Sequence, residues 1–133
     1  MNSVPLSLFL RRVLLFDAMT CLVTGTVMLI ASGTVERLLA IPAPVSTALG
    51  VVLIAFGTAV AWTGTRRHLI RPAVWAIVAL NALWAVESVL ALAFGWLEPN
   101  ATGSALIIAQ AGAVAVIAEL QFLGLRRART VAA

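Results

Sequence analysis

Four apolar runs, each about 20 residues long, constrain this chain more than any other feature of its sequence. They cover residues 13–32, 45–65, 73–95 and 103–125. A helix of about 20 residues spans the roughly 30 Å hydrocarbon core of a bilayer. Backbone groups left unpaired in lipid cost several kcal/mol, so helix is the expected conformation, and the alternating pattern of barrel strands is absent. The runs predict an all-α fold, an integral membrane four-helix transmembrane bundle.

The composition identifies the surrounding solvent. Hydrophobic residues make up 62% of the 133 residues and charged residues 11%, and the mean hydropathy is +1.09. A soluble domain is about half apolar and a quarter charged, so this chain has too little polar surface to cover a globule in water. We therefore predict a single domain over residues 1–133 whose main partner is the lipid bilayer.

The arginines predict how the bundle is oriented. All nine basic residues are arginines, and Arg37 is the only one between the first and second runs. The other eight fall on the opposite side of the membrane, at positions 11, 12, 66, 67, 71, 126, 127 and 129. By the positive-inside rule, both termini are cytoplasmic, and we expect a multi-pass protein of the bacterial inner membrane. The arginines form no basic stripe with interleaved aromatic residues, so no nucleic-acid partner is expected.

The segment "TVERLLAIPA", residues 34–43, separates the first two runs and has two interpretations. It forms either an ordinary loop or a short helix lying on the outer membrane surface. The helical alternative would turn Val35, Leu38, Leu39 and Ile41 toward lipid and Glu36 and Arg37 toward water.

Three carboxylates fall within the apolar runs: Asp17, Glu87 and Glu119. At a rise of 1.5 Å per residue, Asp17 and Glu119 lie roughly 8 and 10 Å from the arginines at their own helix ends. These inner-side carboxylates are expected to reach headgroups or arginines such as Arg126. Glu87 lies roughly 24 Å from Arg71, where an ionised carboxylate costs about 2.5–3.5 kcal/mol. Glu87 is therefore expected to be neutral, or to face water, a cation or a hydrogen-bond partner.

A polar cluster is predicted around Glu87. Asn81, Trp84 and Ser88 occupy adjoining stripes of the same helix, and Gln110 of the fourth run lies near the level of Glu87. The cluster is either a functional site or a set of structural hydrogen bonds between helices.

Gly50, Gly57 and Gly64 recur every seven residues in the second run. They predict a small-residue seam for close helix contact, either inside one bundle or at a homo-oligomer interface. Gly50 matches the level of Glu87 and is expected to let the second and third helices approach closely.

The residues needed for common chemistries are sparse. Cys21 and His68 are the only residues of their types, too few for a thiolate or imidazole metal site. Ser88 and Glu87 are chain neighbours, and adjacent residues on a helix do not face each other. No phosphate-binding loop is present. We expect no catalytic residue, no metal and no cofactor.

The layout resembles the small four-span bacterial inner-membrane proteins of unknown function, including the DoxX-like group. The resemblance covers nearly the whole chain and rests on span count, length and the end pattern "AELQFLGLRR". It implies a four-helix membrane fold and carries over no catalytic residue.

Three functions are compatible with these features. The first is a non-enzymatic membrane protein, acting as a subunit of a larger complex or as a homo-oligomer. The second is a proton-linked carrier or channel for a small solute, with Glu87 as the titrating group. The third is a redox-associated protein that binds a quinone-like or lipid ligand near Trp84 and Glu87.

Overall fold

The computed structural model describes residues 4–132, which contain five α-helices and no strand. The helices are α1 (Leu8–Ile30), α2 (Ser32–Leu39), α3 (Ala43–Gly64), α4 (Arg71–Ala93) and α5 (Ala101–Ala132). Four of them, α1, α3, α4 and α5, are long and apolar enough to cross a membrane. The predicted all-α fold with four candidate spans is therefore confirmed, and the chain has the build of a multi-pass membrane protein.

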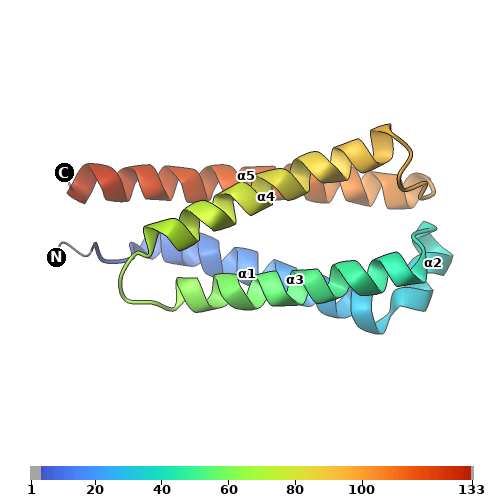
Figure 1. The fold of residues 1–133 in the computed structure, drawn as a ribbon, viewed down its shortest axis with the longest axis horizontal. Helices are drawn as coiled ribbons and strands as arrows, with labels where there is room; N and C mark the ends of the chain where they lie inside the picture. The colour runs from blue at the N-terminus through green and yellow to red at the C-terminus, as the bar shows by residue number, and fades with distance from the viewer. Residues whose placement is uncertain (1–3, 133) are drawn as a thin grey trace.

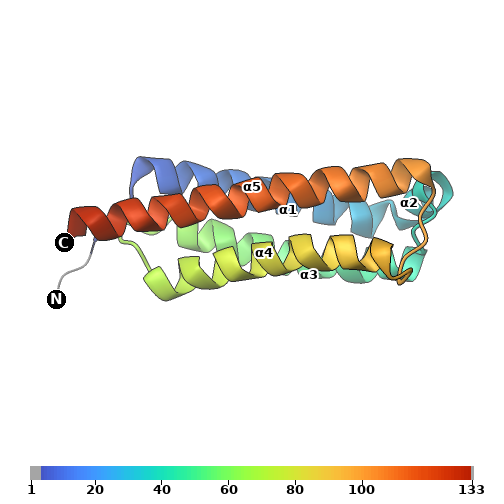
Figure 2. The same ribbon diagram turned by 90° about the horizontal axis from the view of Figure 1, so that it is seen from above.

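The four long helices lie lengthwise in two hairpins (Figures 1 and 2). One hairpin pairs α1 with α3, and the other pairs α4 with α5. The start of α1, the α3–α4 turn and the end of α5 lie together at one end of the bundle. We call this the arginine-bearing end, because its described arginines are Arg11, Arg12, Arg66, Arg67, Arg71, Arg126 and Arg127. Helix α2 and the α4–α5 loop lie at the opposite end.

Residues 34–39 are helical, which favours the helix over the ordinary loop, and the position of this helix on the outer membrane surface stays a prediction. Its predicted faces are only partly right. Leu38 is 64% exposed, whereas Ile41, expected to face lipid, is 6% exposed and buried. The reason is that the end of α2 is tied to the α4–α5 loop. Asn100 donates from Nδ2 to the Leu38 carbonyl at 2.8 Å and from its backbone N–H to the Leu39 carbonyl at 3.1 Å.

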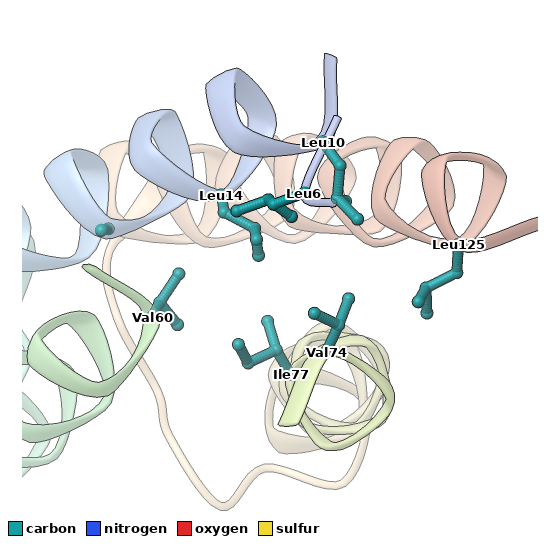
Figure 3. Close-up of a cluster of buried hydrophobic side chains, with 8 residues drawn as sticks. Leu6, Leu10, Leu14, Val60, Val74, Ile77 and Leu125 are labelled. Atoms are coloured by element: carbon teal, nitrogen blue, oxygen red, sulfur yellow. The ribbon is translucent and has the colours of Figure 1, made fainter. Parts of the chain in front are cut away.

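An extended strap, residues 4–6, closes the arginine-bearing end. The Leu6 N–H donates to the Arg67 carbonyl at 3.0 Å, and the Leu69 N–H donates to the Val4 carbonyl at 2.7 Å. The strap places Leu6 over the interior of the bundle. Leu6 packs with side chains from all four long helices, namely Leu10, Leu14, Ala18, Val60, Val74, Ile77 and Leu125 (Figure 3). This apolar cluster lies toward the arginine-bearing end.

The glycine seam of α3 packs against α1 within the same chain. A Cβ added at Gly50 would lie 2.7 Å from the Gly25 carbonyl oxygen, and one at Gly57 would lie 3.0 Å from Cys21 Cβ. One at Gly64 would lie 3.0 Å from Leu15 Cδ2. The expectation that Gly50 brings α3 close to α4 is therefore wrong: the glycine faces Gly25 of α1, where two backbones meet directly. Because α1 covers the seam, packing inside the bundle accounts for its spacing.

Gly50→Ala should destabilise the protein, and Gly112→Ala should not. The new methyl group at position 50 meets a backbone oxygen, so α1 and α3 must separate, at a cost of about 1–3 kcal/mol. Gly112 has no atom within 4 Å of an added Cβ, so alanine there gains helix propensity of up to about 1 kcal/mol. Unfolding in mixed micelles, followed by circular dichroism, compares the two variants. Equal stability of the two would contradict the close contact of α1 with α3.

Candidate functional site: a buried carboxylate between the two hairpins

Asp17 lies on the face of α1 that enters the core. It follows Leu10 and Leu14 on the same inward stripe, at the three- and four-residue spacing that keeps helical side chains on one face. The carboxylate is 1% exposed. The position of Asp17 in α1 thus places an ionisable side chain in the interior of the bundle.

Two carboxamides from the other hairpin meet this carboxylate. Asp17 Oδ2 accepts hydrogen bonds from Asn81 Nδ2 of α4 at 2.8 Å and from Gln121 Nε2 of α5 at 2.7 Å. Asn81 Nδ2 also donates to Gln121 Oε1 at 3.0 Å, and the Cys21 thiol contacts Asp17 Oδ1 at 3.6 Å. We call Asp17, Cys21, Asn81 and Gln121 the Asp17 network. It joins α1 to both helices of the second hairpin.

Three members of the Asp17 network, Asp17, Asn81 and Gln121, are buried and hydrogen-bonded to one another. Asn81 is 4% exposed and Gln121 is fully buried. Among the described residues, no buried side-chain nitrogen or oxygen lacks a hydrogen-bond partner. Hydrogen bonds between membrane helices contribute about 0.6 kcal/mol on average, whereas a buried group deprived of its partner costs about 1–3 kcal/mol. Chemically, the network holds one carboxyl group at the junction of three helices.

A second polar group lies between α4 and α5 and contains three of the predicted cluster residues. Trp84 Nε1 donates to Gln110 Oε1 at 2.9 Å, and Gln110 Nε2 donates to Ser88 Oγ at 3.0 Å. Ser88 Oγ in turn donates to the Trp84 carbonyl at 2.8 Å. All three side chains are half-buried. These bonds hold the second hairpin together at the depth where the sequence placed Gln110.

Glu87 joins neither group. It is exposed, and within the described part of the chain it forms no hydrogen bond or ion pair. Glu87 follows Asn81 by six residues, which turns it about 120° around α4 and away from the interior. The sequence placed Gln110 at the right depth, but Gln110 bonds Trp84 and Ser88 instead. The predicted cluster is thus divided into three parts. Asn81 belongs to the Asp17 network, Trp84, Ser88 and Gln110 bond one another, and Glu87 is isolated.

The two inner-side carboxylates also lie in different surroundings. Asp17 is buried, whereas Glu119 is exposed on α5. Gln121, the partner of Asp17 that sequence reasoning missed, had a detectable signal. It lies five residues before Arg126, and Asp17 lies five residues after Arg12, so the arginines place both at one depth. That signal gives the depth of Gln121 but not the direction of its side chain.

Comparisons with known proteins give no independent assignment of this site. No protein family, curated protein or solved structure matches the chain. Within the part of the chain that the structure describes, no group of three or more His, Cys, Asp or Glu residues is arranged to hold a metal ion.

The losses of folding stability in single variants of the Asp17 network should add up to more than the loss in a variant that removes the network as a unit. Asn81→Leu and Gln121→Met should each destabilise the protein by about 1–3 kcal/mol, because each leaves buried polar groups without partners. The triple variant combines these two substitutions with Asp17→Leu and leaves none of these groups buried. Its loss of stability should therefore be smaller than the sum of the losses in the single variants. The free energy of unfolding of each variant is measured in mixed micelles.

Thr58→Val is the matched control for these variants. The Thr58 hydroxyl is exposed and bonds only the Ile54 carbonyl of its own helix at 2.7 Å, so its loss should change stability little. Additive losses in the triple variant would contradict a cooperative network.

Proposed function

We propose that this protein is a non-enzymatic subunit of a larger assembly in the bacterial inner membrane, and that it contacts its partner through the exposed face of α4. The observation that supports this proposal is the position of Glu87. The carboxylate lies within a candidate span, outside the interior of the bundle, with Leu83 and Val86 exposed beside it.

The energetic argument concerns what surrounds Glu87. It lies six residues before Ala93, so the end of α4 is roughly 9 Å away along the helix axis. Ionisable residues in membrane helices almost always face a protein interior or a water-filled cavity, since an ionised group in lipid costs about 2.5–3.5 kcal/mol. A carboxylate on the outside of one chain therefore favours an interior formed by more than one chain.

A different chain fits this face better than a second copy. A two-fold contact between α4 helices would set the two Glu87 carboxylates against each other, and like charges in close contact oppose ionisation of both. Within this chain, Arg71 is sixteen residues away along α4, and the Arg37 guanidinium of α2 donates to Thr34 Oγ1 of its own helix. The proposed partner therefore presents a hydrogen-bond donor or a guanidinium group on a membrane helix at the depth of Glu87.

The proposed orientation places both termini in the cytoplasm. It is supported by the eight-to-one distribution of arginines and by the positions of α1's start and α5's end at the arginine-bearing end. The likeness to the DoxX-like group stays a prediction from span count, length and end pattern.

A photo-crosslinking residue at Leu83 should yield one adduct of defined mass in intact membranes. Its mass should exceed the 13.9 kDa of this chain by an amount that is not a multiple of 13.9 kDa. The same residue at Val52, exposed on α3, should give no such adduct.

Variants of two exposed carboxylates test whether the crosslinked adduct depends on Glu87. Glu87→Leu should abolish the adduct, because it removes the only polar group of the contact face. Glu119→Leu removes an exposed carboxylate from α5 and should leave the adduct unchanged. An adduct at twice the chain mass would show a homodimer instead, and an adduct that persists in Glu87→Leu would contradict the role of Glu87.

The Asp17 network favours a second function, proton-linked transport with Asp17 rather than Glu87 as the titrating group. Asp17 lies between the two hairpins, where a relative movement of α1 against α4 and α5 would change its hydrogen bonds. Quinone or lipid binding near Trp84 remains a prediction from the sequence.

Proton flux distinguishes the two carboxylates. In proteoliposomes containing a pH-sensitive dye, Asp17→Asn should abolish any flux that the protein supports, because an amide cannot titrate. Glu87→Gln should leave that flux unchanged. Flux that is lost in Glu87→Gln and retained in Asp17→Asn would assign the proton to Glu87, and absence of flux in the unaltered protein would rule out this second function.

A further inference from the structure

A shallow groove runs between α1 and α5, where the two hairpins meet on the outside of the bundle. Its volume is about 630 Å³. Phe9, Arg12 and Phe16 line it on α1, and Ala113, Val116 and Leu120 are among the residues that line it on α5. Arg12 is the only polar residue in the lining, and it lies near the arginine-bearing end. The groove is therefore apolar apart from Arg12, which lies about one turn of α1 beyond Phe9.

A second arginine stands at the same end of the groove. Arg127 follows Leu120 by seven residues, so it shares that stripe of α5 two turns closer to the helix end. The Arg127 Cζ atom lies 5.1 Å from the centroid of the Phe9 ring, which lines the groove. Arg12 and Arg127 are both exposed. Two guanidinium groups from different hairpins thus lie beside the same apolar groove.

We propose that this groove binds one anionic phospholipid, with an acyl chain along the groove and the phosphate on Arg12 and Arg127. From Arg12 to Phe16 the groove follows four residues of α1, or roughly 6 Å, which covers the part of an acyl chain nearest the headgroup. Basic pockets between membrane helices are typical sites for anionic headgroups, and guanidinium groups bind phosphate through two parallel hydrogen bonds. This proposal is independent of the contact face on α4.

No carboxylate opposes this assignment within the groove. Asp17 follows Phe16 but faces inward to Asn81 and Gln121. Glu119 precedes Leu120, which turns it about 100° around α5, and it is not part of the lining. An acyl chain is needed to fill the apolar part, so free phosphate would satisfy only the arginines.

Native mass spectrometry of the full chain tests the proposal. The protein is released from micelles that contain equal amounts of phosphatidylglycerol and phosphatidylcholine, and the bound lipids are counted. One phosphatidylglycerol should be retained in preference to phosphatidylcholine. The double variant Arg12→Gln and Arg127→Gln should weaken this retention about 25-fold, from about fivefold per arginine.

Two matched controls separate the groove from diffuse surface attraction and from misfolding. The double variant Arg66→Gln and Arg67→Gln removes the same charge from the α3–α4 turn and should change retention less than about twofold, well below one arginine's share. Ala113→Phe fills the groove without changing the charge and should also abolish retention. Ala115→Phe adds the same ring at an exposed position outside the lining and should not.

Three results would overturn the proposal. Equal losses in the two arginine pairs would show non-specific attraction to the arginine-bearing end. Retention in Ala113→Phe, with its helicity intact by circular dichroism, would place the lipid elsewhere. Displacement of the lipid by glycerol phosphate, or a second protein chain bound in its place, would show that the groove does not accommodate an acyl chain.

Discussion

The contact between the two hairpins depends on one requirement, that a carboxylate among membrane-spanning helices must find its hydrogen bonds inside the bundle. Asp17 enters the interior from α1, and its donors come from Asn81 on α4 and Gln121 on α5. The arrangement of the hairpins brings both donors to Asp17 together. An alternative packing would leave at least one buried polar group unpaired, at about 1–3 kcal/mol each. The network therefore selects one packing of the hairpins more than it adds net stability.

Each hairpin is held together by a different physical means. Between α1 and α3, glycines on both helices let the backbones approach, and the contact is one of van der Waals packing. Between α4 and α5, Gln110 links Trp84 to Ser88 by hydrogen bonds. The strap at residues 4–6 and the contacts of Asn100 with α2 then fasten the two ends. The exposed long faces of the bundle are mainly apolar, with Glu87 and Glu119 as their carboxylates.

Two features on the outside of the bundle are not explained by the chain's own packing. Glu87 is a carboxylate on an otherwise apolar face of α4, and Arg12 and Arg127 flank an apolar groove between α1 and α5. The first favours a protein partner, because lipid offers no donor at that depth. The second favours an anionic lipid, because a headgroup and an acyl chain match the two parts of the groove. The two features lie on different helices, so both contacts fit one molecule.

The sequence by itself determined four candidate spans, the placement of most arginines at one end and the position of each polar residue along its helix, because these follow from local hydropathy and from the fixed rise of a helix. It left residues 34–43 undecided between loop and helix. It grouped Glu87 with Asn81 because they lie on adjoining stripes of one helix, and with Gln110 because the two lie at similar depths. Only the tertiary structure decided which helix faces which. Gly50 meets α1 rather than α4, Asp17 meets Gln121, and Glu87 turns outward. Depth belongs to one helix, whereas the partner of a side chain depends on how four helices rotate against one another.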